Sequence, residues 1–319
     1  MRKHQLIGVL AVFAIAASAC ASSSTTPQRP VAERSGHAAY PLTLRDAAGT
    51  VTIPHRPTRI VSLSATGTQM LFAIGAGAQV IAVDQYSTYP SSAPRTNLSG
   101  SQPNVEAIAR YRPDLVINDA DVGNLSRSLK ALRVPVLIEP AAKSFAVSYQ
   151  QIADLGAATD HEHGARQTVS SMRSHIARIV ASVPRPSRPL RVYHELDPTF
   201  YSATTATFIG QIYRLFGLRN VADKAGITRN SGYPQLSAEY VVASNPQVIV
   251  LADIACCHQS ARTVAARPGW SRVDAVRHDL VLGVDDSLAS EWGPRIVEFV
   301  GRVAKLLQRA ETVYGAGQP

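Results

Sequence analysis

The stretch that decides the fold is SYQQIADLGAATDHEHGARQTVSSMRSHIARIVASV, residues 148–183. Its second half spaces apolar residues by four and three, which places one apolar stripe on one face of an α-helix. Pro184 follows directly, and proline ends a helix because it lacks the N–H group and clashes with the preceding turn. The pattern predicts one long helix over residues 148–183. Its stripe consists of Ala165, Val169, Met172, Ile176, Ile179 and Val183.

Short apolar strands alternate with helical segments on both sides of this helix. Before it, we expect a hairpin around residues 46–49 and buried strands at 59–63, 79–84, 114–118 and 135–138. After it, we expect strands at 190–194, 247–251 and 280–284. Such alternation is typical of parallel sheets covered by helices on both faces. The predicted fold class is α/β, with two lobes of mainly parallel sheet bridged by one long helix and a ligand cleft between them.

The first residues are typical of a lipoprotein signal. A basic start, Arg2-Lys3, precedes the apolar run 6–17, and the small residues of ASAC lead into Cys20. We expect Cys20 to be lipidated and to anchor an extracytoplasmic protein to the membrane; cleavage after Ala19 is the alternative. The predicted domains are 1–20 signal and lipidated Cys, 21–40 flexible tether, 41–147 first lobe, 148–183 linking helix, 188–312 second lobe and 313–319 tail.

Composition and motifs narrow the function. The net charge is +9, but Lys and Arg are scattered, so no nucleic-acid partner is expected. The sequence has no Gly-x-Ser-x-Gly elbow, no P-loop and no His-Glu-x-x-His motif, so no catalytic residues are expected. Cys256 and Cys257 are adjacent and lack the spacing of a zinc site, which leaves a vicinal disulfide or free thiols and no metal.

The two halves repeat one pattern. Glu106 precedes Pro113 and an apolar strand, and Glu239 precedes Pro246 and another at the same spacing. With this repeat and six further motifs, the sequence resembles the helical-backbone (class III) substrate-binding proteins. The motifs are RIVSLS (59–64), LFAIGAG (71–77), PNVEAI (103–108), LSAE (236–239), RPGW (267–270) and GPR (293–295). Those proteins serve ABC importers of ferric siderophores, haem and cobalamin.

The resemblance implies a monomeric solute-binding lipoprotein, with no cofactor, that delivers its ligand to a permease. The expected ligand is an iron complex, a ferric siderophore first, with haem and cobalamin as alternatives. Ser101 stands where haem-binding relatives carry an axial Tyr, which disfavours haem through that position. Ligand-contacting side chains are expected at strand ends and in the loops that follow them. They are Ser64, Asp84, Tyr86, Tyr89, Asp121, His194, Tyr201, Trp292 and Arg295.

Two residues are expected to dock the permease. Glu239 matches the second-lobe Glu that pairs with an importer arginine in this family, and Gln69 stands where we expect the first-lobe partner. The alternative for Gln69 is a capping box with Thr66. Gln69 lacks the charge that would pair with an importer arginine. The alternative function is therefore an envelope interaction protein that has lost importer coupling. Asp121 has its own alternative, which is to cap the helix that follows it.

Overall fold

The computed structural model describes residues 39–185, 188–227 and 229–315. The signal segment, Cys20 and nearly all of the predicted tether lie outside these residues. The described part starts with the predicted hairpin, formed by β1 (Leu42–Asp46) and β2 (Gly49–Ile53), with Asp46 opposite Gly49. No helix within the described ranges is long and apolar enough to cross a membrane.

The first lobe (residues 39–159) contains a five-stranded parallel sheet in the order β5-β4-β3-β6-β7. The central strands are apolar and covered on both faces, as continuous apolar runs predict. Strand order reverses at β3, and such a switch point leaves room for a ligand at the strands' carboxyl ends. The elements are β3 (Ile60–Ser62), α1 (Ala65–Ala73), β4 (Val80–Asp84), β5 (Arg95–Leu98), α2 (Val105–Ala109), β6 (Leu115–Asn118), α3 (Leu125–Ala131) and β7 (Val136–Ile138).

The second lobe (residues 188–315) contains a four-stranded parallel sheet in the order β11-β10-β8-β9. Its strands are β8 (Arg191–Glu195), β9 (Arg219–Asn220), β10 (Val248–Leu251) and β11 (Val281–Gly283). Its helices are α6 (Phe208–Leu215), α7 (Ala238–Ser244), α8 (Ile254–Cys257), α9 (Ala261–Ala265), α10 (Asp274–Arg277), α11 (Asp286–Ser290) and α12 (Ile296–Tyr314). Short 3-10 turns lie at Ala76–Gln79, Val122–Asn124, Val221–Ala225, Arg229–Gly232 and Trp270–Arg272.

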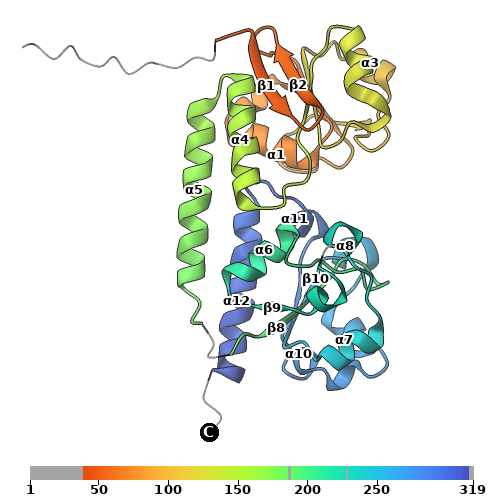
Figure 1. Cartoon of the computed structure of the whole chain (residues 1–319), viewed down its shortest axis with the longest axis vertical. Helices are drawn as coiled ribbons and strands as arrows, with labels where there is room; N and C mark the ends of the chain where they lie inside the picture. Colours follow the sequence, from red (N-terminus) through yellow and green to blue (C-terminus); the bar gives the residue numbers. More distant parts are fainter. Residues whose placement is uncertain (1–38, 186–187, 228, 316–319) are drawn as a thin grey trace, which may run out of the picture. The chain divides into compact units, whose positions relative to one another are not determined.

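The linking segment corrects one prediction. Residues 148–183 are not one helix: α4 (Phe145–Thr159) ends at Asp160, whose φ of 63° is left-handed, and α5 (Glu162–Ala181) starts afterwards. Helix α4 packs on α1 and belongs to the first lobe (Figure 1). Helix α5 lies beside α4 and contacts both α1 and α12, so one long helix does bridge the lobes. Residues from both lobes and α5 form one continuous hydrophobic core.

Candidate functional site

Two first-lobe carboxyl groups lie where strands of the parallel sheet end. Asp84 is the last residue of β4, and Asp119 follows β6 directly. Asp84 is buried and accepts hydrogen bonds from the Ser87 amide (3.0 Å) and the Ser87 hydroxyl (2.6 Å). Burial raises the pKa of both carboxyl groups above their ordinary value, and the charge of Asp119 adds to the effect on Asp84.

The second lobe adds acidic groups from the segment between β11 and α12. Burial raises the pKa of Glu291 to about 7; Arg295 opposes this rise, whereas Asp285 and Asp84 add to it. Asp84 comes from the first lobe, so carboxyl groups of both lobes act on each other here. We call the set of Asp84, Asp119, Asp285, Glu291 and Arg295 the acidic cluster. It holds four carboxyl groups and one guanidinium group.

Aromatic side chains border the acidic cluster. Tyr86 and Tyr89, in the loop after β4, are 63% and 47% exposed, which is unusual for large rings. The Arg295 guanidinium carbon lies 4.4 Å from the centre of the Tyr89 ring, a cation–π contact between the lobes. Trp292 is partly buried: its indole N–H donates to Gln151 Oε1 of α4 at 2.7 Å. The structure therefore brings four sequence-predicted ligand residues to one region: Asp84, Tyr89, Trp292 and Arg295.

Gln69 is not at the surface where a docking residue must lie. It is 2% exposed, and a Cβ atom built on Gly293 of the second lobe would lie 2.8 Å from Gln69 Oε1. The capping box with Thr66 is also wrong, because Ser64 caps α1 and accepts from the Gly67 amide at 3.2 Å. Helix α1 starts two residues earlier than that box requires, so Gln69 faces the second lobe.

His194 is wrong as a cleft residue. It is fully buried, and its Nδ1 lies 2.6 Å from the Tyr213 hydroxyl oxygen inside the second lobe. Burial alone lowers its pKa to about 3, so the ring is neutral. Asp121 takes its alternative role at the start of α3, where it accepts from the Ser126 amide at 2.8 Å. Tyr201 is half-buried and pairs with Gln235 in an isolated β-bridge.

Glu106 is an exposed first-lobe glutamate that the sequence analysis did not consider for docking. It is exposed in the first turn of α2, where Asn104 caps the helix. Glu239 is exposed in the first turn of α7, which Ser237 caps. The two glutamates thus hold corresponding places in the two lobes. Their equal spacing from Pro113 and Pro246 was the signal that identifies Glu106 from the sequence.

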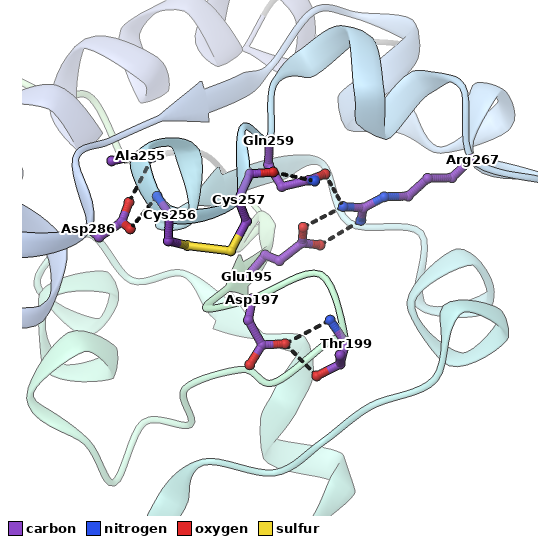
Figure 2. The surroundings of a disulfide bond; sticks show 9 residues. All are labelled: Glu195, Asp197, Thr199, Ala255, Cys256, Cys257, Gln259, Arg267 and Asp286. Atoms are coloured by element: carbon purple, nitrogen blue, oxygen red, sulfur yellow. Dashed lines mark hydrogen bonds and ion pairs between the residues drawn. A yellow bond between two sulfur atoms is a disulfide. The ribbon is translucent and has the colours of Figure 1, made fainter.

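A buried polar network beneath the second-lobe strand ends was also not predicted. Arg267 donates to both oxygens of Glu195, at 2.6 and 2.5 Å (Figure 2). Tyr193 also donates to Glu195, at 3.0 Å. Asp253 is fully buried, and burial together with the negative Glu195 raises its pKa. Nearby, Cys256 and Cys257 form a disulfide, which decides between the two states left open by the sequence.

Comparisons with known proteins agree with this architecture. A family model described as periplasmic binding protein matches residues 60–288. An uncharacterized ABC transporter substrate-binding lipoprotein of Bacillus subtilis, YvrC, is 31% identical over 276 residues, 83% of this chain and 85% of YvrC. A cobalamin-binding protein of Halobacterium salinarum is 32% identical over 308 residues, 92% of this chain and 82% of that protein.

Solved structures give the same fold. The vitamin B12-binding protein BtuF of Vibrio cholerae superimposes with a TM-score of 0.65 at 24% identity, covering 81% of this chain and 99% of BtuF. The haem-binding protein RhuT of a Roseiflexus species, without ligand, gives 0.69 at 24% identity, covering 80% and 99%. Structures with different ligands in their names therefore share this fold equally well.

Proposed function

Since the chain belongs to the periplasmic binding protein family, we propose that it is the extracytoplasmic solute-binding subunit of an ABC importer and that its ligand is a corrinoid such as cobalamin. The acidic cluster between the lobes is the observation that carries the choice of ligand. The Halobacterium relative, which exceeds 30% identity over most of both chains, supports the same choice through its name.

The charge of the cluster distinguishes the candidate ligands. Haem carries two propionates, and many ferric siderophores are anionic, whereas the peripheral side chains of a corrinoid are mainly neutral amides. One negative charge about 4 Å from a carboxylate is opposed by about 4 kcal/mol at an effective dielectric of 20. Arg295 acts on Glu291 and Asp285, and Asp84 and Asp119 add two further carboxyl groups, so we expect net repulsion of an anionic ligand. An amide accepts a hydrogen bond from a protonated carboxyl group through its oxygen and donates one to an ionised carboxylate through its nitrogen.

Exposed tyrosine rings supply the apolar contact. Arg295 lies over one face of the Tyr89 ring, and the remaining exposed surface of Tyr86 and Tyr89 offers contact area to a macrocycle. A ferric siderophore, the ligand expected from the sequence, remains the competing prediction. The iron-binding and haem-binding structures are under 25% identical, so they support the fold alone.

Fluorescence titration of variants tests the assignment. We expect cyanocobalamin to quench tryptophan emission with a submicromolar dissociation constant, because Trp292 borders the cluster. Tyr86→Ala and Tyr89→Ala should each weaken binding about five- to thirty-fold, the loss expected from about 1–2 kcal/mol of ring contact. Leu132→Ala is the control, an equally exposed side chain at the end of α3. Cyanocobalamin affinity that is unchanged in both tyrosine variants would contradict the stacking site.

Docking is assigned to Glu106 and Glu239, one exposed carboxylate on each lobe. Two separated charges fix the orientation of a binding protein on a permease that offers two cations. The burial of Gln69 removes the observation that favoured an envelope protein without importer coupling. We expect Glu106→Gln with Glu239→Gln to abolish cobalamin uptake by cells while leaving ligand affinity unchanged. Glu162→Gln, another first-turn glutamate, is the matched control. Full uptake by the double variant would contradict this assignment.

Lipid attachment at Cys20 completes the proposal. A tethered binding protein stays near its permease, which raises its effective concentration there. We expect Cys20→Ala to release the protein from the membrane fraction without changing ligand affinity. Retention of the variant in membranes would contradict anchoring through this cysteine.

A further inference from the structure

An accessible disulfide lies at the end of strand β10. It joins neighbouring residues of α8: Cys256 is exposed and Cys257 is half-buried. This short helix has no buried residue, and its first residue, Ile254, is half-buried and packs against the second-lobe core. Its start is held by Asp286, which accepts from the Ala255 amide at 3.1 Å and the Cys256 amide at 3.0 Å (Figure 2). Because Cys256 is exposed, the disulfide is accessible to a solvent thiol.

Hydrogen bonds connect this disulfide to the buried ion pair of the second lobe. Gln259 donates from Nε2 to the Cys257 carbonyl at 3.1 Å. The Oε1 of the same side chain accepts from Arg267 Nη2 at 2.7 Å, and Arg267 in turn binds both oxygens of Glu195. Figure 2 shows this continuous path from the sulfur atoms to the end of strand β8. A shift of the Cys257 backbone therefore moves a direct partner of Arg267.

The ion pair depends on the position of Arg267. Glu195 and Asp253 are both fully buried, and neither oxygen of Asp253 has a hydrogen-bond partner in the described structure. Arg267 is the cation that acts on both carboxyl groups. Loss of one partner from a buried ion pair is strongly destabilising, because the remaining charge is left without compensation. Asp253 also begins the turn that contains the disulfide, so the turn and the ion pair form one unit.

We propose that Cys256–Cys257 is a reversible redox site that an extracytoplasmic dithiol reductant opens, and that opening loosens residues 253–259 and the Arg267–Glu195 contact. A thiolate of the reductant attacks the exposed Cys256 sulfur, the Cys256–Cys257 bond breaks, and Cys257 leaves as a thiolate that takes up a proton. The second thiol of the reductant then breaks the mixed disulfide and releases Cys256. The reductant becomes a disulfide, and two electrons and two protons pass to the protein. The site is independent of which ligand the protein binds.

Alkylation of the full-length protein tests the redox step. Iodoacetamide is added to the folded protein before and after dithiothreitol, and the peptide that contains residues 256–257 is analysed by mass spectrometry. We expect no alkylated cysteine in this peptide before reduction and two afterwards. Two alkylated cysteines before reduction, or none after it, would overturn the assignment. Cys20 lies in a different peptide and does not affect the result.

Hydrogen exchange tests the structural consequence. We expect the amides of residues 253–259 to exchange at least tenfold faster after reduction, while β1 and β2 stay unchanged. The double variant Cys256→Ser/Cys257→Ser should match the reduced protein and should not respond to dithiothreitol. Because the reduced wild-type protein is measured as well, a folding defect of the variant would not hide the result. Equal exchange in oxidised and reduced wild-type protein would overturn the proposed loosening.

Discussion

His194 illustrates how burial determines the chemistry of a residue. Its folded pKa of about 3 lies below the ordinary value of 6.5, because the core disfavours the charged ring. A depressed histidine pKa contributes stability that is fully present above pH 6.5 and is lost as the pH falls toward 3. We expect this residue to reduce the free energy of unfolding by about 1.4 kcal/mol per pH unit below that value. His194→Gln should remove this slope in urea unfolding at pH 7 and 5; equal slopes in both proteins would contradict the neutral buried ring.

Glu291 has the opposite pH dependence. Its folded pKa of about 7 lies above the ordinary 4.5, so the unfolded chain releases its proton first as the pH rises. The folded state therefore loses stability between pH 4.5 and 7 and keeps that penalty at higher pH. Glu291→Gln should be more stable than wild type at pH 8 and similar to it at pH 4.5. Thermal unfolding at the two pH values measures this, and a variant that is equally stabilised at both would argue against a buried ionisable group.

The sequence predicted the positions of some candidate site residues correctly and misplaced others. Tyr86 and Tyr89 were singled out because they follow a strand, and strand ends of a parallel sheet gather at one edge. Trp292 and Arg295 were singled out through the family resemblance of the stretch around Gly293. His194 was misplaced because both faces of a parallel sheet are covered, so strand position does not tell a cleft side chain from a core one. The roles of the site residues in binding stay predictions.

Among the elements, strands were predicted more accurately than the linker. Parallel strands are short, continuous apolar runs, and each of the seven apolar runs predicted to be a buried strand contains a strand in the structure. The break between α4 and α5 has no Gly or Pro: Asp160 adopts the left-handed conformation that ends α4. Asp adopts this conformation more readily than most residues, but most Asp residues do not adopt it. The sequence alone therefore did not predict the break. The apolar stripe from Ala165 to Ile179 lies in the bridging helix, and Val183, its last predicted member, follows the helix end.

Two glycines lie where α5 meets its neighbours, and mutation of each tests the packing of this helix. A Cβ at Gly164 would lie 2.0 Å from the Ile74 carbonyl oxygen of the first lobe, so Gly164→Ala should destabilise the protein by about 1–3 kcal/mol or more. At Gly301 of α12, the nearest atom is Ile179 Cδ1 of α5 at 3.9 Å. Gly301→Ala should therefore stabilise by about 0.5–1 kcal/mol through helix propensity. Urea unfolding of both variants gives the values. A neutral Gly164→Ala would contradict the close approach of α5 to the first lobe.

At the scale of the whole molecule, the lobes are held together around the acidic cluster. A shared core, the bridging helix and the Trp292–Gln151 hydrogen bond join them, and the charge of Asp84 in the first lobe raises the pKa of Glu291 in the second. Such joining favours small closing movements over large ones. Sequence and family resemblance predicted this two-lobe plan. They did not predict the acidic cluster, because it depends on side chains that segments some 200 residues apart bring together.

Calorimetric titration of the folded protein with cyanocobalamin, haemin and ferric desferrioxamine at pH 7.5 tests the corrinoid assignment against its competitors. We expect a 1:1 complex with cyanocobalamin at submicromolar affinity and binding at least a hundredfold weaker for haemin. Ferric desferrioxamine is cationic, so the acidic cluster does not repel it, but it should bind weakly because it offers no macrocycle for the tyrosine rings. Tight binding of haemin or of the ferric complex, without binding of cyanocobalamin, would contradict the corrinoid assignment while leaving the family and fold in place.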